Sequence, residues 1–496
     1  MDSAPIRDSP PSGAAPGVPG ERSLRGDVPV DRASSPQPPR SVSEPGTPGA
    51  VPAARISGQP SQFARDSLGI FAAQIAVMLM GIGTSVITAR TLGPSGRGLF
   101  ALLVNFPPLV SNFAKLGIPQ ATVYCIRRRG AGTSAVASNS LWLALGLGGA
   151  LAAACYLGRG WLLDTALRGV PPVTVPIVLV LLPFVMVQTF FLGVLQAEQR
   201  FREYNLQQIA PTALGLVGMS VALLWLRAGL IGAVLVQTGI VALVTIWLVV
   251  RVHRRAPLRL AFDRPVAREM LTFGGKSYVQ TLAATLHRSI DQYMINFFLG
   301  PAPVGLYVVA VNLTNVLMKI PDATGTVLYP RLASLGEDDA HAATSRVCRH
   351  TLFITATLGL VYLLLGPLAI RVLYGTRFAG AIRPMLIMLP GIVMMSLYMI
   401  LTRNFTSRNR QGVNMVAAGL ALGVNFGLNC VLIPRWGISG AALSTAVSYS
   451  LAALMLLVMF VRESGHSVAE TILVGREEIG DYARRARNLV PGMAAK

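Results

Sequence analysis

The feature that most restricts the fold of this chain is a series of apolar runs that begins near residue 67. Each run has about 20 residues, the length a helix needs to cross a bilayer core roughly 30 Å thick. Only 13% of the 496 residues are charged, about half the fraction found in soluble domains. The sequence therefore predicts twelve membrane-spanning helices, near 67–90, 99–125, 134–157, 172–196, 208–227, 229–251, 274–299, 305–329, 346–367, 381–403, 412–433 and 437–461.

An internal repeat divides these helices into two halves. Residues 92–100 (LGPSGRGLF) lead to Asn105, and residues 299–307 (LGPAPVGLY) lead to Asn312 in the same register. A second pair of similar segments, 227–233 and 435–441, follows at nearly the same offset. Similarity at a fixed spacing indicates a duplicated unit. We expect an all-α membrane protein built from two six-helix halves.

The predicted halves cover residues 67–251 and 271–461, and a basic linker, 252–270, joins them. Residues 1–66 are rich in Pro, Ser, Gly and Arg. Such a segment buries too little apolar surface to offset its ordering entropy, so we expect a disordered tail. Residues 462–496 are expected to form a basic C-terminal tail. No apolar core precedes residue 67, so a cleavable signal peptide is not expected.

The positions of Arg and Lys predict the orientation, because basic residues accumulate in cytoplasmic loops. Placing both termini inside puts residues 127–129, 251–268 and 403–410 in the cytoplasm, and these segments are richer in Arg than the outside loops. The net charge of +21 then reflects topology and attraction to anionic head groups rather than nucleic-acid binding. Because each half has six helices, both halves begin on the same side of the membrane. This arrangement is typical of transporters with parallel repeats and a cavity between the two halves.

Polar residues within the predicted helices are the best guide to function, because they are costly in lipid and usually face a cavity or a partner. They follow one face of the second helix, which Pro107 and Pro108 are expected to kink, and the eighth helix repeats the pattern. Arg288 lies in the seventh helix, roughly 21 Å from its start. The candidate residues are Asn105, Asn112, Lys115, Gln280, Arg288, Asp291, Asn312, Asn315, Lys319 and Asp322.

Two interpretations of these residues stay open. In one, Arg288 pairs with Asp291 and Lys319 pairs with Asp322, and both pairs only hold helices together. In the other, Arg288, Lys319 and Lys115 line a cationic cavity together with the polar amides, and Asp291 or Asp322 couples the site to an ion.

Other arginines have simpler explanations. Arg90 and Arg97 flank the first Leu-Gly-Pro segment and are expected to snorkel to the outer interface. Arg200 and Arg408 lie in loops that either gather an anionic substrate or only follow the positive-inside rule.

Catalytic and metal-binding motifs are absent from the sequence. It contains no P-loop and no His/Cys metal set, and its four cysteines lie within or at the ends of apolar runs. We therefore expect neither enzyme activity nor a cofactor or metal. The energy for any transport is expected from an ion gradient, the membrane potential or the substrate gradient.

The two halves, the Leu-Gly-Pro-x-x-x-Gly-Leu-Phe/Tyr segments, and the run from Asp291 through Gly300 to residues 329–332 (YPRL) resemble bacterial lipid-linked oligosaccharide flippases. These are the polysaccharide transporter (Wzx-type) members of the MOP exporter superfamily. The resemblance covers about residues 65–462. It implies a MOP/MATE-like fold around a central cavity, in the cytoplasmic (inner) membrane of a bacterium.

The resemblance also implies an activity. Such proteins move an undecaprenyl-diphosphate-linked oligosaccharide to the outer leaflet by alternating access, for exopolysaccharide or O-antigen assembly. Arg288 and Lys319, with Lys115 as a third cation, would then bind the diphosphate, and Asp291 or Asp322 would couple transport to H⁺ or Na⁺. The implied partners are membrane lipids, a polysaccharide polymerase and glycosyltransferases.

Two other functions stay open. The first is an ion-coupled multidrug or small-molecule antiporter of the same superfamily, although such proteins usually keep an acidic site in the first half, and the first helix here carries no acid. The second is a non-transporting membrane scaffold of a glycan-synthesis complex.

Overall fold

The computed structural model of the chain describes residues 60–130, 132–259, 261–475 and 478. Most of both predicted tails lies outside these residues. The described segments contain helices and connecting turns but no strand. The first half consists of α1 (Pro60–Ala114), α2 (Ile118–Arg127), α3 (Thr133–Leu157), α4 (Arg159–Asp164), α5 (Thr174–Leu179), α6 (Leu181–Ala197), α7 (Phe201–Ser220), η1 (Val221–Trp225) and α8 (Gly229–His253).

The second half begins with α9, and a short helix follows it. Its elements are α9 (Arg264–Leu299), α10 (Pro301–Leu317), α11 (Lys319–Ser334), α12 (Glu337–Ala369), η2 (Ile370–Tyr374), η3 (Thr376–Ala381), α13 (Ile382–Ser407), α14 (Gln411–Trp436), α15 (Ile438–Ser464) and the short α16 (Val468–Ile472). The predicted linker is shorter than expected, because α8 extends to His253 and α9 begins at Arg264.

The helices agree with the prediction of a multi-pass membrane protein. Among the described residues, nine helices are long and apolar enough to cross a membrane, or ten if α10 and α11 form one bent span. The first of these, Gln74–Ala114, holds two predicted helices, since its backbone breaks at Gly93. With α9 at the position of the seventh, each of the twelve predicted helices has a helical counterpart.

Both Leu-Gly-Pro segments form the same turn. Gly93 has φ 67° and ψ −179°, and Gly300 has φ 84° and ψ −175°. Only glycine adopts this region freely, because a Cβ would clash with the backbone there. Gly229 and Gly437, at the start of the last helix in each half, also share a φ of 61°. The repeat therefore extends from sequence to backbone geometry.

The second helix of each half is broken. α1 ends at Ala114, and Leu116 and Gly117, with φ of 46° and 67°, form a turn before α2. α10 and α11 meet at a 42° bend. Pro107 and Pro108, where a kink was expected, both lie inside α1, and the helix ends further along the chain. The chain leaves the helix where the positive φ angles occur, and a proline removes only one hydrogen bond.

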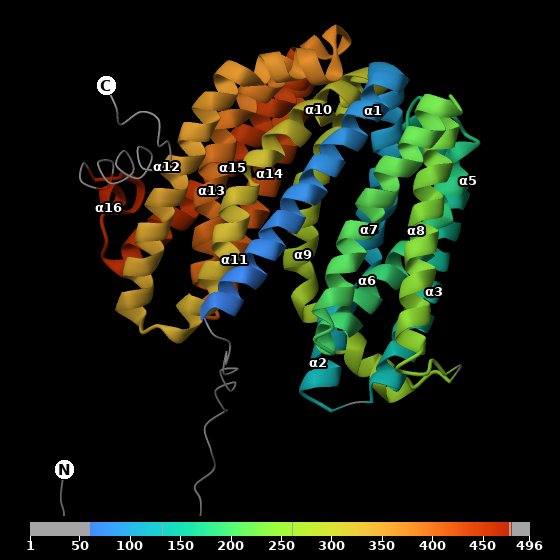
Figure 1. Cartoon of the computed structure of the whole chain (residues 1–496), viewed down its shortest axis with the longest axis horizontal. Helices are drawn as coiled ribbons and strands as arrows, with labels where there is room; N and C mark the ends of the chain where they lie inside the picture. Colours follow the sequence, from blue (N-terminus) through green and yellow to red (C-terminus); the bar gives the residue numbers. More distant parts are fainter. Residues whose placement is uncertain (1–59, 131, 260, 476–477, 479–496) are drawn as a thin grey trace, which may run out of the picture. The chain divides into compact units, whose positions relative to one another are not determined.

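The first helix of each half packs against the opposite half (Figure 1). In α1, Ala89 joins an apolar cluster with Val309 of α10 and Tyr374 of η2. Near the start of α9, Met270 belongs to a cluster of the first half with Phe190 of α6. The halves also meet where both Leu-Gly-Pro turns lie. We call this the Leu-Gly-Pro end of the molecule.

Candidate functional site

Asp291 lies at the centre of a buried polar cluster in the second half. α9 carries Asp291, and Tyr307, Asn429 and Thr445 come from α10, α14 and α15. The hydroxyls of Tyr307 and Thr445 each donate to Oδ2 of Asp291 at 2.8 Å, and Nδ2 of Asn429 donates to Oδ1 at 2.7 Å. Asn429 also donates to Oδ1 of Asn425 at 3.1 Å. Four helices thus surround one carboxylate.

This cluster supplies neutral donors but no cation among the described residues. Asp291 is 5% exposed, and a carboxylate without a counter-charge is costly to bury even when it is hydrogen-bonded. Oδ1 of Asn429 is buried and has no hydrogen-bond partner among the described residues. Carboxylate, amide and hydroxyl oxygens are ligands that suit a hard cation. The cluster can therefore be neutralised by a proton or by a small cation such as Na⁺.

Lys115 and Lys319 lie at the breaks in the second helices of the two halves. Lys115 is half-buried and donates to Oδ1 of Asn112 at 3.0 Å, and Lys319 is exposed at the start of α11. Neither lysine forms an ion pair within the part of the chain that the structure describes. Lys319 lies roughly 27 Å along the helix from Pro301. Both lysines are therefore far from the Leu-Gly-Pro end.

The remaining predicted amides do not form a single site with the lysines. Asn105 donates to Oε1 of Gln292 at 2.9 Å, which links α1 to α9 one residue from Asp291. Asn312 donates to Oγ of Ser85 at 3.3 Å, and Asn315 is exposed. The side chains of Gln280 and Arg288 lie outside the described residues, so the predicted Arg288–Asp291 pair is not described either.

The predicted Lys319–Asp322 pair is not formed. Oδ1 of Asp322 lies 3.6 Å from Nη2 of Arg403, which reaches it from α13. Gly325, one turn further along α11, makes this possible, because an added Cβ there would lie 3.3 Å from Cγ and Nε of Arg403. The missing side chain lets Arg403 lie across the helix, and Lys319 keeps its charge without a carboxylate partner in the described residues.

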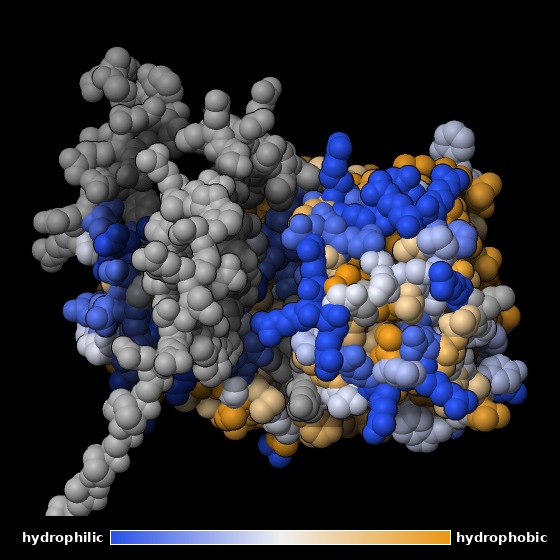
Figure 2. Space-filling model, turned by 90° about the horizontal axis from the view of Figure 1, so that it is seen from below, coloured by the Kyte–Doolittle hydropathy of each residue, from blue (hydrophilic) through white to orange (hydrophobic). Residues whose placement is uncertain are grey.

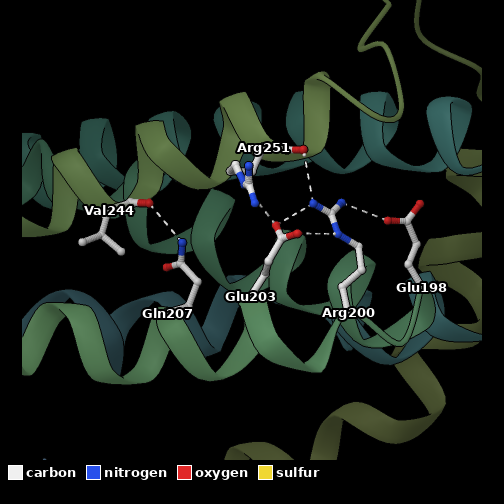
Figure 3. A network of polar contacts seen from close by, with 6 residues as sticks. All are labelled: Glu198, Arg200, Glu203, Gln207, Val244 and Arg251. Carbon is white, nitrogen blue, oxygen red and sulfur yellow. Dashed lines mark hydrogen bonds and ion pairs between the residues drawn. The ribbon is translucent and has the colours of Figure 1, made fainter.

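Arg200 belongs to a nearly buried ion network (Figure 3). Its side chain is 8% exposed and pairs with Glu203 at 2.5 Å and Glu198 at 3.1 Å. Arg251 at the end of α8 lies 3.5 Å from the same Glu203. In the second half, Arg408 pairs with Glu337 at 2.6 Å. These contacts hold helix ends together, which supports the simpler interpretation of both loops.

Comparison with known proteins identifies the family. The family model described as "Polysaccharide biosynthesis protein" matches residues 63–336. This chain belongs to that family.

Two curated relatives of this family member come from Haloferax volcanii. The "probable low-salt glycan biosynthesis flippase Agl15" is 24% identical over 190 residues, which are 37% of this chain and 40% of that protein. The "probable flippase AglR" is 23% identical over 202 residues, which are 39% of this chain and 42% of that protein. The chain thus spans about two fifths of the length of these relatives.

Solved structures confirm the predicted fold class. The lipid II flippase MurJ in an inward closed conformation has a TM-score of 0.70 at 13% identity, with 80% of this chain and 90% of that chain covered. An inward-facing MATE-family multidrug transporter of the MOP superfamily has a TM-score of 0.65 at 14% identity, with 78% and 94% covered. The family member is an all-α membrane protein with the MOP/MATE-like fold.

The sequence analysis identified Asp291 but missed the residues that bind it. Asn425 and Asn429 are four residues apart in an apolar helix, and this spacing places both amides on one face. That spacing was the signal in the sequence of α14 that pointed to a buried polar site. Thr445 offered none, since single hydroxyls are common in membrane helices. Tyr307 was visible only as the last residue of the repeated segment 299–307, which does not indicate its partner.

Proposed function

We propose that this protein is a flippase for a lipid-linked glycan. In detail, it moves an undecaprenyl-diphosphate-linked oligosaccharide from the inner to the outer leaflet of a bacterial cytoplasmic membrane, for exopolysaccharide or O-antigen assembly. The observation that carries the proposal is a pair of cations, Lys115 and Lys319, each at the break in the second helix of its half and each without a carboxylate partner among the described residues. Hydrogen bonds from ammonium groups to phosphate oxygens are charge-assisted and therefore strong. The family and the names of the relatives support a glycan as the cargo.

The distribution of exposed charge supports an orientation with the Leu-Gly-Pro end outside. Figure 2 views the opposite end, where hydrophilic side chains cover much of the first half and hydrophobic ones border it. Basic residues of this kind favour the cytoplasmic side. The exposed arginines of the first half and the linker at this end are Arg127, Arg128, Arg129, Arg202, Arg254, Arg255 and Arg259.

The contact between the halves at the Leu-Gly-Pro end supports a state that is closed to the outside. In the proposed cycle the substrate enters from the cytoplasmic end, where Lys115 and Lys319 bind its diphosphate, and leaves when the closed contact opens. Asp291 is the proposed coupling residue for H⁺ or Na⁺, because its carboxylate is buried among neutral oxygens and amides. Asp322 is the weaker choice, since Arg403 already pairs with it.

Two observations favour a second candidate, an ion-coupled antiporter for small molecules. The buried acid at Asp291 and the fold likeness to MATE transporters both fit that activity. A cationic drug would, however, be repelled by Lys115 and Lys319. The charge of these lysines therefore favours an anionic cargo over a cationic one. It also favours a transporter over a scaffold, because a scaffold without transport does not need a binding site for an anion.

The test is complementation of a flippase-null bacterial strain with the wild type, K115Q, K319Q, R288Q and the K115Q/K319Q double variant. R202Q is the matched control, because Arg202 is an exposed cation at the same end. Membrane abundance is measured first, and surface polysaccharide and lipid-linked glycan are then quantified. We expect the double variant to reach normal abundance, to lose surface polysaccharide and to accumulate the lipid-linked intermediate, while R202Q restores the surface polymer.

Full restoration by the double variant would contradict the proposed role of the lysines. Failure of the wild type, despite normal abundance, would reject the flippase proposal and favour the antiporter or the scaffold. Export of fluorescent cations by the same wild-type cells then distinguishes those two.

A further inference from the structure

Arg97 is buried at the Leu-Gly-Pro end, so the prediction that it snorkels is wrong. The residue is 7% exposed, and its Cζ lies 5.8 Å from the centre of the Phe100 ring. Nη2 lies 3.4 Å from Oγ of Ser85. Within the described residues, Nε has no hydrogen-bond partner and no carboxylate forms an ion pair with the guanidinium. The second half covers this arginine before its side chain can reach water.

Several donors around Arg97 share a single hydroxyl acceptor. The hydroxyl of Tyr374 and Nδ2 of Asn312 each donate to Oγ of Ser85 at 3.3 Å. Three donors, counting Nη2 of Arg97, thus converge on one hydroxyl oxygen with only two lone pairs. All three bonds are longer than the usual values of about 2.8–3.0 Å. Oγ of Ser85 is thus fully used, and Nε of Arg97 keeps no acceptor among the described residues. An oxyanion is a group that supplies one.

This cluster lies between the two halves. Ser85 and Arg97 belong to the two segments of α1, and Asn312 and Tyr374 belong to α10 and η2. Next to Arg97, the segment Pro94–Gly98 packs closely against Pro301–Gly305. Transport by alternating access requires the halves to part here. Parting removes the cover from the guanidinium.

We propose that Arg97 is a second anion-binding residue, which takes the diphosphate of the substrate when the Leu-Gly-Pro end opens. This inference rests on the proposed flippase function and adds an exit site to it. Arg97 lies at one end of the second helix and Lys115 lies at its break, roughly 27 Å away along the chain at 1.5 Å per residue. The planar guanidinium binds two oxygens of a phosphate at once. The diphosphate thus passes from the lysines at the entry end to the arginine at the exit end.

The unpaired charge also favours opening of this end. A buried cation without a counter-charge destabilises the closed state, and a ligand that binds the open state better shifts the population toward it. Methionine is uncharged and packs in irregular apolar spaces. R97M therefore removes the anion-binding group and the buried charge together. We expect transport to fall while the closed state becomes more stable, whereas loss of an arginine that only holds the fold lowers both.

The experiment compares purified wild type, R97M, R97K and R168Q in vesicles that contain an undecaprenyl-diphosphate-linked oligosaccharide. Arg168 is the matched control, because it is exposed at the same end and its neighbour Gly169 packs on Pro301. Flipping is measured by digestion of the glycan with an enzyme on one side of the vesicle. We expect R97M to flip at least about tenfold more slowly, as for loss of a charge-assisted hydrogen bond. Its ligand-free Tm should equal or exceed that of the wild type, R97K should lose less flipping, and R168Q should match the wild type.

Flipping by R97M at the wild-type rate would overturn the inference and leave the proposed function standing. A Tm of R97M below that of the wild type would overturn it as well, since the arginine would then hold the fold.

If the wild type moves no glycan, the proposed function fails, and Arg97 is tested with inorganic diphosphate. The K115Q/K319Q background removes the two lysines of the proposed entry site, and sodium chloride of equal ionic strength is the control. A rise in Tm with diphosphate that R97M abolishes supports the anion site. An equal rise with and without Arg97 rejects it.

Discussion

Gly98 and Gly305 lie against each other's helices in a reciprocal contact. A Cβ added to Gly98 would lie 1.9 Å from the carbonyl oxygen of Pro301, and one added to Gly305 would lie 2.0 Å from that of Pro94. The two glycines occupy equivalent positions in the repeat, so the contact follows the twofold relation between the halves. The close approach of two backbones requires glycine at both positions.

Alanine at either position should push the halves apart at this end. We expect G98A and G305A each to lower the free energy of unfolding by about 1–3 kcal/mol, the usual cost of overpacking, and to impair flipping. In the double variant the second alanine should cost less than the first, because one separation relieves both clashes. Thermal unfolding in detergent measures these differences.

The control for this prediction is G149A in α3, where an added Cβ meets nothing within 4 Å. It should be neutral or stabilise the helix by about 0.5–1 kcal/mol. Strictly additive losses in the double variant would show that the two glycines do not share one contact.

Arg90 provides a second link between the halves at the Leu-Gly-Pro end. Its Nε donates to the carbonyl oxygen of Leu373 at 2.7 Å, and Nη2 donates to that of Val372 at 2.5 Å. These carbonyls lie in the last turn of η2, where helical partners are missing. Because Arg90 is exposed, R90Q should weaken the closed contact by only about 0.5–1 kcal/mol.

Spin labels at Ser95 and Ala302, on opposite sides of the contact, measure this effect. R90Q should increase the share of long distances between the labels. R371Q is the control, since Arg371 is an exposed arginine of η2 itself. An unchanged distance distribution in R90Q would mean that the arginine does not hold the halves together.

The network around Arg200 should matter for stability rather than for transport. R200Q leaves Glu198 and Glu203 without their shared cation, and Glu203 is only 13% exposed. We expect a loss of about 1–3 kcal/mol in stability and lower membrane abundance, with flipping per molecule unchanged. Quantitative immunoblots combined with vesicle assays separate the two quantities.

The exposed neighbour Arg202 supplies the control, because R202Q should change neither stability nor flipping. Normal abundance of R200Q together with lost flipping would instead place Arg200 on the substrate path.

The helices and the repeat were predictable because both are local properties of the chain. A membrane helix needs only sufficient length and apolarity, since its backbone hydrogen bonds are all internal. The turn at Gly93 and Gly300 was visible as well, because both glycines stand between a leucine and a proline in the same register. The positive φ angles of both glycines confirm that the motif fixes the backbone.

The partners of the polar residues depend on packing between distant segments, so they were not predictable in the same way. The donors to Asp291 come from Tyr307, 16 residues away, and from Asn429 and Thr445, 138 and 154 residues away. Helical spacing suggested Lys319 as the ion-pair partner of Asp322. In the structure the carboxylate of Asp322 pairs instead with Arg403 from α13. The snorkelling rule failed for Arg97 because it describes a helix facing lipid, and here the other half covers the side chain.

Asp291 allows the sharpest test of ion coupling. D291N keeps the shape of the side chain and a carbonyl oxygen that accepts from the hydroxyls of Tyr307 and Thr445, but it removes the charge that attracts a cation. If Na⁺ binds the folded protein at a hundred times its Kd, it stabilises the wild type by about 2.7 kcal/mol. We expect D291N to lose this stabilisation, measured as the difference in Tm between NaCl and choline chloride at equal ionic strength.

Transport completes this test. In vesicles with an imposed Na⁺ or pH gradient, flipping by the wild type should respond to one of the two gradients, and D291N should respond to neither. D322N should behave like the wild type, because Asp322 is half-exposed and already paired with Arg403. A D291N protein that keeps its gradient response would exclude Asp291 as the coupling residue, whereas a wild type indifferent to both gradients would mean that transport follows the substrate gradient alone.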